Sequence, residues 1–376
     1  MDNPINRLKS DVSRNLLNVP GWRTRRKLVV FESDDWGSIR MPSAGVLETF
    51  ISRGFDLASS DYNRIDTLES NVDLELLFGV LQKHKDAAGN PPVLTANCVV
   101  GNPDFGKIRE SDFSTYFVEP VTETLLRYPG RERVEELWKQ GDAAGLFHPQ
   151  FHGREHVNVV RWMEALARKS EAIMFTFDHG TTFSGDGDYN FMEVLDYNSP
   201  EDLVKMKEGL REGLDLFEKI FGFRSRSFIP PCYTWNSEVE ETLHEGGVRY
   251  IQGLVKQLIP TGSFGNYRSK LHFLGKRNRF GQYFLIRNGF FEPALNKRTD
   301  LAGEVLNRIQ IAFRWHKPAI IGSHRINFMG SLDAKNRERN LQLLDELLSR
   351  IVKQWPDVEF ISSDHLGDLI AKEQEQ

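Results

Sequence analysis

The sequence predicts an α/β fold built on parallel strands, because short apolar runs alternate with longer amphipathic segments along the chain. The apolar runs are rich in β-branched and aromatic residues and are bounded by polar turns, as expected for strands buried on both faces. No internal repeat, low-complexity tract or Pro/Gly/Ser-rich linker divides the 376 residues. The pattern alone leaves two arrangements open, a doubly wound sheet and a barrel.

Each apolar run predicts one strand, and the expected strands are 27–33, 93–99, 145–151, 172–177, 226–230, 248–254, 283–287, 318–323 and 358–362. Segments of helical period predict helices at 43–53, 72–85, 131–140, 157–169, 200–221, 237–245, 301–316, 333–354 and 364–373. In barrels of parallel strands, chemistry concentrates on the loops that follow the carboxyl ends of the strands. Polar residues placed directly after an apolar run are therefore the candidates for a functional site.

Composition narrows the classes of partner. The formal net charge of −5 gives no electrostatic reason to expect nucleic acid or an anionic membrane as a partner. The two cysteines, Cys98 and Cys232, are far apart and lack metal-ligand spacing, so neither a disulfide framework nor a zinc knuckle is expected. The first residues contain no apolar stretch of signal-peptide length, and we expect a cytoplasmic protein that acts on a small molecule or carbohydrate.

A pair of adjacent carboxylates, Asp34 and Asp35, follows the apolar run 28–31. Two neighbouring carboxylates at a strand end point in different directions, so one can bind a metal ion while the other accepts a proton. The alternative is an aspartate that caps the next helix beside a solvated neighbour. This segment alone does not choose between the two interpretations.

Three histidines, His148, His152 and His156, recur at four-residue spacing after the expected strand 145–151. Imidazole is a common zinc ligand, and a His-x3-His step can bring two rings to one ion at about 2.0–2.1 Å each. The pair 148/152 and the pair 152/156 have the same spacing, so both remain open. This cluster is the strongest signal for a metal site in the sequence.

Three further segments place polar or aromatic residues beside apolar runs. Residues 226–236 combine an arginine, a double proline and aromatic residues, which suggests a stiff wall beside a cleft. His324 follows the run 318–321, where it could act as a general acid or be a hydrogen-bonded structural histidine. Residues 287–293 could line the same cleft. Asp178, His179, Asp186 and Asp188 are expected to be loop residues without a catalytic role.

Taken in order, these segments resemble the motifs of the polysaccharide deacetylase family, the NodB-homology or carbohydrate esterase 4 group. The resemblance covers about residues 27–370 and rests on Asp34-Asp35, the His-x3-His step, Arg226 with its prolines and aromatics, and the late His324. It implies a (β/α)7-type distorted barrel, with a single domain over 22–372 after an N-terminal extension over 1–21.

The resemblance also implies roles for individual residues. Asp34 would be the catalytic base, Arg226 the arginine that orients it, and His324 the acid. A divalent ion, expected to be zinc, would be held by Asp35, His152 and His156, with His148 as the alternative ligand. An amide near Cys232 or Tyr233 would stabilise the oxyanion. The residues expected to line the substrate cleft are Trp36, Pro231, Tyr233, Trp235, Arg287, Glu292 and Arg325.

The chain departs from the family pattern in three places. Its first motif reads Ser-Asp-Asp-Trp, a cysteine follows the double proline, and the Asp-Trp motif that steadies the catalytic histidine has no clear counterpart. Residues 287–292 occupy the position of that missing motif. The expected activity is removal of an acyl group, N-acetyl above all, from a carbohydrate or related substrate.

The sequence also leaves two rival functions open. Residues 152–156 match the H-x-x-E-H pattern of a metallopeptidase, in which Glu155 would be the base. That motif needs a continuous helix, which Pro149 and Gly153 disfavour. The second rival is a non-catalytic barrel that binds saccharide, which the missing Asp-Trp motif favours.

Overall fold

The computed structural model describes residues 12–57, 60–185, 191–296 and 300–375. Its parallel strands form one curved sheet in the order β10-β7-β6-β5-β2-β1-β12-β11, to which β13 adds beside the beginning of β1. These strands are β1 (Lys27–Trp36), β2 (Leu94–Val99), β5 (Phe147–Gly153), β6 (Ser227–Phe228), β7 (Tyr250–Gly253), β10 (Tyr283–Ile286), β11 (Gly289–Phe290), β12 (Ala319–His324) and β13 (Val358–Phe360).

The sheet closes on itself at the junction of β10 and β11. The amide of Arg287 donates to the carbonyl of Gly253 in β7, and the next amide, of Asn288, donates to the carbonyl of Ile320 in β12. Strands β10 and β11 therefore share one position in the ring, between β7 and β12. Strand β13 pairs only with the beginning of β1, and the other described strands occupy seven such positions, which confirms the predicted distorted α/β barrel and excludes the doubly wound sheet.

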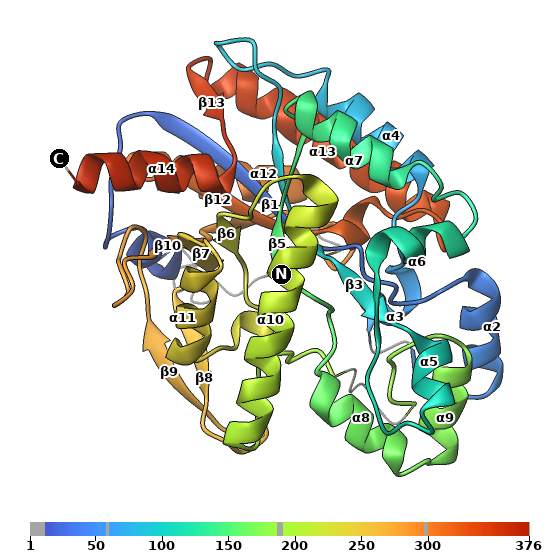
Figure 1. Ribbon diagram of the computed structural model, residues 1–376. Coiled ribbons are helices and arrows are strands. Elements are labelled where there is room, and N and C mark those ends of the chain that lie inside the picture. The colour runs from blue at the N-terminus through green and yellow to red at the C-terminus, as the bar shows by residue number, and fades with distance from the viewer. Residues whose placement is uncertain (1–11, 58–59, 186–190, 297–299, 376) are drawn as a thin grey trace.

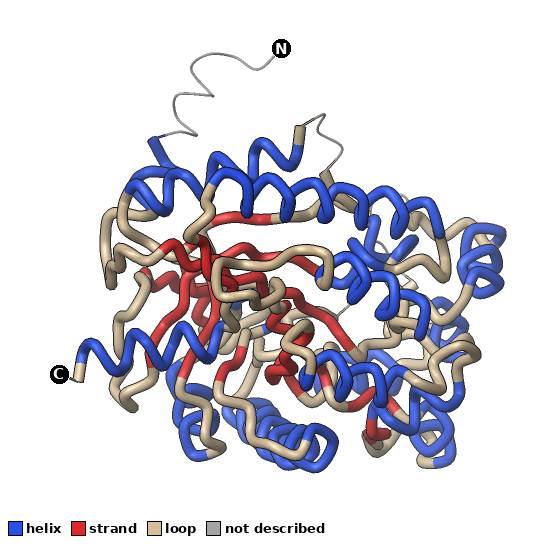
Figure 2. The backbone as a smooth tube through the Cα atoms, turned by 90° about the horizontal axis from the view of Figure 1, so that it is seen from above, coloured by secondary structure: helices blue, strands red, loops and turns tan. Residues whose placement is uncertain are grey.

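Helices surround this barrel, and Figure 2 shows the strands gathered in the middle of the molecule with helices outside them. The helices are α2 (Ala44–Ser52), α3 (Asp61–Ile65), α4 (Asn71–Leu81), α5 (Phe105–Glu110), α6 (Val121–Arg127), α7 (Val134–Ala143), α8 (Val159–Ala167), α9 (Glu171–Asp178), α10 (Pro200–Phe221), α11 (Ser237–Glu245), α12 (Leu301–Arg314), α13 (Ala334–Gln354) and α14 (Ser363–Gln374). Within the described ranges, no helix combines the length and apolar character needed to cross a bilayer.

Smaller elements lie outside the barrel sheet. Two small antiparallel sheets of two strands each, neither of which the sequence predicts, lie outside the main sheet, and α5, α8 and α9 pack together at one end of the molecule (Figure 1). These strand pairs and the short 3-10 helices are β3 (Gly101–Pro103) with β4 (Val118–Pro120), β8 (Lys256–Pro260) with β9 (Tyr267–Leu271), η1 (Pro231–Tyr233) and η2 (Arg325–Phe328).

Helix α10 shows how local sequence sets an element's limits. Ser199 caps its first turn in a reciprocal capping box with Asp202, and Pro200 occupies the first turn, where its missing N–H costs no hydrogen bond. Gly222 ends the helix in the left-handed region, at a φ of 80°. These signals explain why the predicted limits, 200–221, match the observed ones.

The prediction of a strand at 172–177 is wrong, because this segment belongs to helix α9. Ser170 accepts a hydrogen bond from the Ile173 amide and so caps the helix. Ile173, Thr176 and Phe177 are buried at three- and four-residue spacing, which is a helical period. Asp186, Asp188 and residues 1–11 of the expected N-terminal extension lie outside the described residues, and the domain limits at 22 and 372 stay a prediction.

Side chains of β1 alternate between two sides of the sheet. Val29 and Phe31 belong to the large core between sheet and helices, whereas Leu28 and Val30 pack in a second cluster with Ile320 of β12 and apolar residues of α14. Glu32 and Asp34 continue the side of Leu28 and Val30. Both carboxylates therefore point into the barrel interior, with apolar residues beneath them.

Candidate active site

The predicted site residues Asp34, Asp35, His152 and His324 come from three strands that run parallel, so they meet at one end of the barrel. A bulge in β1 brings both aspartates to this end. Three residue steps of β1, from Ser33 to Trp36, match two steps of β2, and Asp35 has a φ of 77°. The extra residue re-aims Asp35, which in a regular strand would point away from the side of Asp34.

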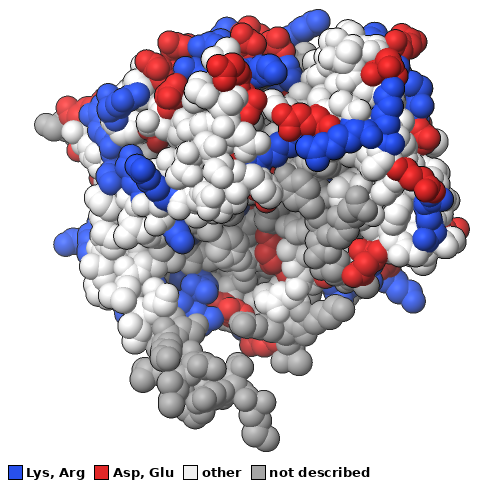
Figure 3. Space-filling model, turned by 90° about the horizontal axis from the view of Figure 1, so that it is seen from below, with Lys and Arg blue, Asp and Glu red and all other residues white. Residues whose placement is uncertain are grey.

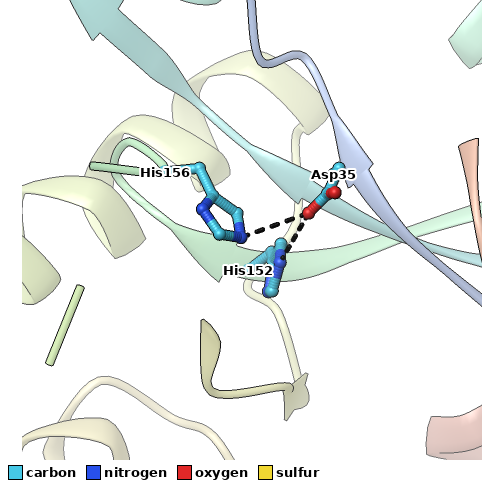
Figure 4. A group of neighbouring side chains, drawn as sticks. All are labelled: Asp35, His152 and His156. Atoms are coloured by element: carbon cyan, nitrogen blue, oxygen red, sulfur yellow. Dashed lines mark hydrogen bonds and ion pairs between the residues drawn. The ribbon is translucent and has the colours of Figure 1, made fainter. Parts of the chain in front are cut away.

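Asp35, His152 and His156 converge on one point, as Figure 4 shows. The Nε2 atoms of His152 and His156 lie 3.3 and 3.2 Å from the same oxygen, Oδ1 of Asp35. One ligand atom from each of the three residues lies within 4.8 Å of the others. All three side chains are buried. The separation between Asp35 and these imidazoles therefore supports the predicted ligand set.

The protonation of these side chains fits a divalent ion. Nδ1 of His152 lies 2.8 Å from the carbonyl oxygen of Ile229, to which it donates, so Nε2 is the ring nitrogen that faces Asp35. Burial lowers the pKa of His156 to about 4 against the opposing effect of Asp35, so its imidazole is neutral. Although burial favours the protonated acid, His156 and Arg40 hold the pKa of Asp35 well below its ordinary value. One carboxylate and two imidazoles are a ligand set typical of catalytic zinc.

Asp34 lies beside this site and is held by Arg287. Arg287 Nη2 donates to Oδ1 at 2.7 Å and Nη1 donates to Oδ2 at 2.8 Å, while the Asn97 amide also donates to Oδ1 at 2.8 Å. Burial alone would raise the pKa of Asp34, but the guanidinium of Arg287 outweighs it and lowers the pKa to about 2. Nε of the same arginine donates to Glu32 at 2.6 Å, so one buried cation joins two buried carboxylates.

His324 is the second group that faces Asp34. Its Nε2 lies 3.7 Å from Asp34 Oδ2, and its Nδ1 lies 2.6 Å from Glu292 Oε1. Asn327 donates to the other oxygen of Glu292 at 2.8 Å and fixes that carboxylate. Burial disfavours the imidazolium, but Glu292 overcomes this effect and raises the pKa of His324 to about 9. His324 is therefore a cation at neutral pH and can donate a proton.

A cavity of about 230 Å³ opens over these groups. The face of the molecule seen from below is hollowed near its centre, and acidic side chains are visible in the hollow (Figure 3). The cavity is lined by Asp34, Asp35, Arg40, Ser60, Tyr62, His152, His156, Met192, Ile229, Pro230, Cys232, Tyr233 and His324. Tyr233 is the one residue of the predicted substrate-binding set among them.

Two residues that the sequence predicts at this site, His148 and Arg226, lie at the opposite end of the barrel. His148, the alternative metal ligand, lies near the beginning of β5, with Nδ1 2.7 Å from Asp142 and Nε2 3.3 Å from Asp364. Arg226, expected beside Asp34, precedes β6 and pairs with Asp368. The residues that precede parallel strands lie at the other end from those that follow them, so the position expected for Arg226 is wrong and Arg287 occupies it.

Other residues expected in the substrate cleft are buried in the protein. Trp36 is fully buried, and its indole N–H donates to Ser33 Oγ; Trp235 donates to Glu240 Oε1. Arg325 is also fully buried and pairs with Asp66 and Glu69. Their aromatic and cationic character therefore serves packing and buried ion pairs, and direct substrate contact is not available to them.

Three remaining cleft residues have other positions. Arg287 and Glu292 hold Asp34 and His324, so they sit behind the predicted base and acid. Pro231 lines a larger neighbouring cavity, of about 520 Å³, together with residues of α8 and α10. Of these three residues, none lines the cavity over Asp34 and Asp35 within the described part of the chain.

Sequence reasoning missed Arg40, Tyr62 and Glu32. Glu32 had a usable signal, because it is a charged residue that directly follows the apolar run 28–31 inside an expected strand. Arg40 and Tyr62 had none, since they lie in segments between predicted elements. Their place in the cavity depends on how the loops after β1 fold.

Residues 152–156, which match the metallopeptidase pattern, do not form a helix. His152 belongs to strand β5, and helix α8 begins only at Val159. The Glu155 carboxylate accepts hydrogen bonds from Arg154 Nε at 2.6 Å and Tyr116 Oη at 3.1 Å. The two histidines and the glutamate therefore lack the helical arrangement on which that mechanism depends.

Comparisons with known proteins give matches only among solved structures. No family model and no curated protein matches the chain. The structure is similar to a probable polysaccharide deacetylase from Pseudomonas aeruginosa PAO1, with 11% identity over 92% of this chain and 91% of that chain, at a TM-score of 0.44. It is also similar to PuuE allantoinase, with 12% identity over 92% and 91% and a TM-score of 0.45.

A third similar structure is BA3943 from Bacillus anthracis, a CE4 family pseudoenzyme, with 11% identity over 91% of this chain and 65% of that chain and a TM-score of 0.37. The solved structures that resemble this chain thus include the polysaccharide deacetylases that the order of its motifs resembles. At these identities and TM-scores, no activity and no residue role is transferred from them to this chain.

Proposed function

We propose that this protein is a metal-dependent hydrolase that removes an acyl group, N-acetyl above all, from a carbohydrate or a related small molecule. The observation that carries the proposal is the convergence of Asp35, His152 and His156 within 4.8 Å beside a second buried carboxylate, Asp34. A structural zinc site would have four protein ligands and no such neighbour, whereas a catalytic site keeps a position open for water or substrate.

Asp35, His152 and His156 would hold the ion, for which zinc is the expected identity because the donors are one oxygen and two nitrogens. When bound, such an ion polarises the acyl carbonyl and lowers the pKa of water in the site. The neutral state of His156 and the charged state of Asp35 both favour ion binding.

Asp34 would accept the proton of the attacking water, and His324 would donate a proton to the leaving nitrogen or oxygen. Their environments push their pKa values apart, to about 2 for Asp34 and about 9 for His324, so the base is ionised and the acid is protonated over one wide pH range. Arg287 and Glu292 would act as positioning residues that hold this base and this acid in place.

The amide of Cys232 is the preferred oxyanion donor. The amide of Tyr233 is already bonded to the Pro230 carbonyl, and among the described residues no backbone acceptor pairs with the Cys232 amide. Cys232 and Tyr233 both have a positive φ, 53° and 54°, a strained conformation of the kind found at functional sites. One such donor contributes about 3–4 kcal/mol to transition-state stabilisation in other hydrolases.

The test replaces the proposed base. In Asp34→Asn, acetate release from zinc-loaded protein acting on N-acetylated amino sugars should fall by about 10²–10⁴-fold, while one zinc per chain remains bound. Asp368→Asn is the matched control, because Asp368 also pairs with an arginine but lies at the opposite end of the barrel. Turnover retained in Asp34→Asn would remove Asp34 as the base.

A further inference from the structure

Arg40 forms a cationic wall of the cavity that the mechanism above does not use. It follows β1, and its side chain is 13% exposed. Arg40 Nη2 donates to Asp35 Oδ2 at 3.1 Å, and Nε lies 3.4 Å from Asp66 Oδ2. These contacts leave Nη1, whose partner within the described ranges is the thioether sulfur of Met192 at 2.9 Å. A thioether is a weak acceptor for a guanidinium N–H.

Met192 and Arg40 both line the cavity, so this poorly matched donor lies at its surface. Tyr62 stands between Arg40 and His324: its ring centroid lies 5.5 Å from the guanidinium carbon and 5.5 Å from the His324 ring. The two carboxylates that line the cavity are each paired with an arginine, Asp34 with Arg287 and Asp35 with Arg40. A ligand near Arg40 therefore meets a cationic donor, Nη1, beside the Tyr62 ring.

The cavity has room for a single sugar ring. Its volume of about 230 Å³ lies below the roughly 300–1,000 Å³ of cavities that hold drug-sized ligands. The same cavity contains the proposed metal ligands, so a carboxylate held at Arg40 would lie close to the acyl group. Arg40 and the two imidazoles contact opposite oxygens of one carboxylate, that of Asp35.

We propose that the substrate is an acidic amino sugar, a single acylated sugar ring whose carboxylate is bound by Arg40 Nη1 in place of Met192. This inference rests on the proposed function for the identity of the scissile group. A charge-assisted N–H···O bond is stronger than the N–H···S contact it replaces, so the carboxylate adds binding that a neutral sugar lacks. Arg40 is then a specificity-determining residue of the site.

The experiment compares neutral N-acetylglucosamine with two acids, 2-acetamido-2-deoxyglucuronate and N-acetylmuramate. With zinc-loaded wild type, kcat/KM for at least one acid should exceed that for the neutral sugar about tenfold or more. In Arg40→Gln the ratio should approach one, and in Arg40→Lys it should be intermediate. Arg226→Gln, at the other end of the barrel, should keep the wild-type ratio. The ratio is insensitive to a general loss of activity.

Binding provides the second readout. Zinc-loaded Asp34→Asn, titrated by calorimetry with the same three compounds, should bind the preferred acid about tenfold more tightly than the neutral sugar. Adding Arg40→Gln to that variant should remove the difference, with zinc content measured in parallel. Because this readout does not need turnover, it separates the anion-binding role of Arg40 from the deacetylase proposal.

The outcomes are distinct. Equal kcat/KM and equal affinity for the neutral sugar and both acids would overturn the acidic substrate and leave the deacetylase intact. Acid-selective binding that depends on Arg40, without turnover of any of the three, would overturn the deacetylase and keep the anion subsite. Neither turnover nor binding of any of the three would overturn both.

Discussion

Strand β5 carries His148 near its beginning and His152 near its end, and at each end an imidazole lies beside an aspartate. At the beginning, burial is outweighed by Asp142 and Asp364, which raise the pKa of His148 to about 9, so this ring is a cation. Just beyond the other end, His156 contacts the same aspartate as His152, Asp35. Burial lowers the pKa of His156 to about 4, so this ring is neutral. Only a neutral imidazole has a lone pair for a metal ion.

Arg226 and Arg287 show the same difference between the two ends of the barrel. Arg226 pairs with Asp368 where the two side chains are 37% and 38% exposed, whereas Arg287 and Asp34 are 0% and 5% exposed. An exposed pair contributes little to stability, but a buried pair that loses one partner leaves an uncompensated charge. The two ends therefore contain the same residue types but differ in burial and in the number of carboxylates around them.

The largest effect should come from exchanging the two arginines for lysine. Arg287→Lys cannot keep both hydrogen bonds to Asp34 and the bond to Glu32, so we expect a fall in kcat of about 10²-fold or more. The free energy of unfolding should fall by about 3–5 kcal/mol. Denaturant unfolding and acetate release measure the two effects.

Arg226→Lys is the matched variant at the opposite end. Because its pair with Asp368 is more than a third exposed, its free energy of unfolding should change by less than about 1 kcal/mol, and its kcat should match wild type. Equal losses in Arg226→Lys and Arg287→Lys would show that the two ends do not differ as described.

A smaller effect should follow from replacing the carboxylate that pairs with His324, and none from replacing one that pairs with His148. In wild type, the protonated form of His324 is present below its pKa of about 9 and is lost as the pH rises through that value, so the rate should fall on the alkaline side there. Glu292→Gln removes the group that raises this pKa. The alkaline fall in kcat should then move about 1–3 pH units lower.

The control is Asp142→Asn, which removes a carboxylate from His148 instead. It should leave the pH profile of kcat unchanged, because His148 lies at the opposite end of the barrel from the cavity over Asp34 and Asp35. An alkaline limb that stays in place in Glu292→Gln would mean that His324 is not the acid.

Much of the fold could be predicted because its signals are local. Apolar runs mark β1 and β12, and the capping residues of α10 mark both its ends. The segment 172–177 was misassigned because a short apolar run fits a strand and a buried helical turn equally well. The hairpin of β8 and β9 was missed because most of β9 is exposed and polar, so it lacks an apolar run.

The site could be predicted in part. Residue type and spacing predict a histidine-based metal site near the end of the expected strand 145–151, but they leave the pairs 148/152 and 152/156 open, and only the family resemblance selected Asp35, His152 and His156. The choice of Arg226 over Arg287 was wrong although the order was visible: Arg226 precedes its strand and Arg287 follows one. Nothing in the sequence reveals that Trp36 turns inward, because its direction depends on the bulge at Asp35.

The most direct test of this account is the metal content of three purified proteins: wild type, His156→Ala and His148→Ala. We expect about one zinc ion per chain in wild type and in His148→Ala, and a loss of affinity of more than about 100-fold in His156→Ala, because His156 is a proposed ligand and His148 lies at the opposite end of the barrel. Equal zinc affinity in all three, or a loss in His148→Ala alone, would contradict the assignment of the metal site.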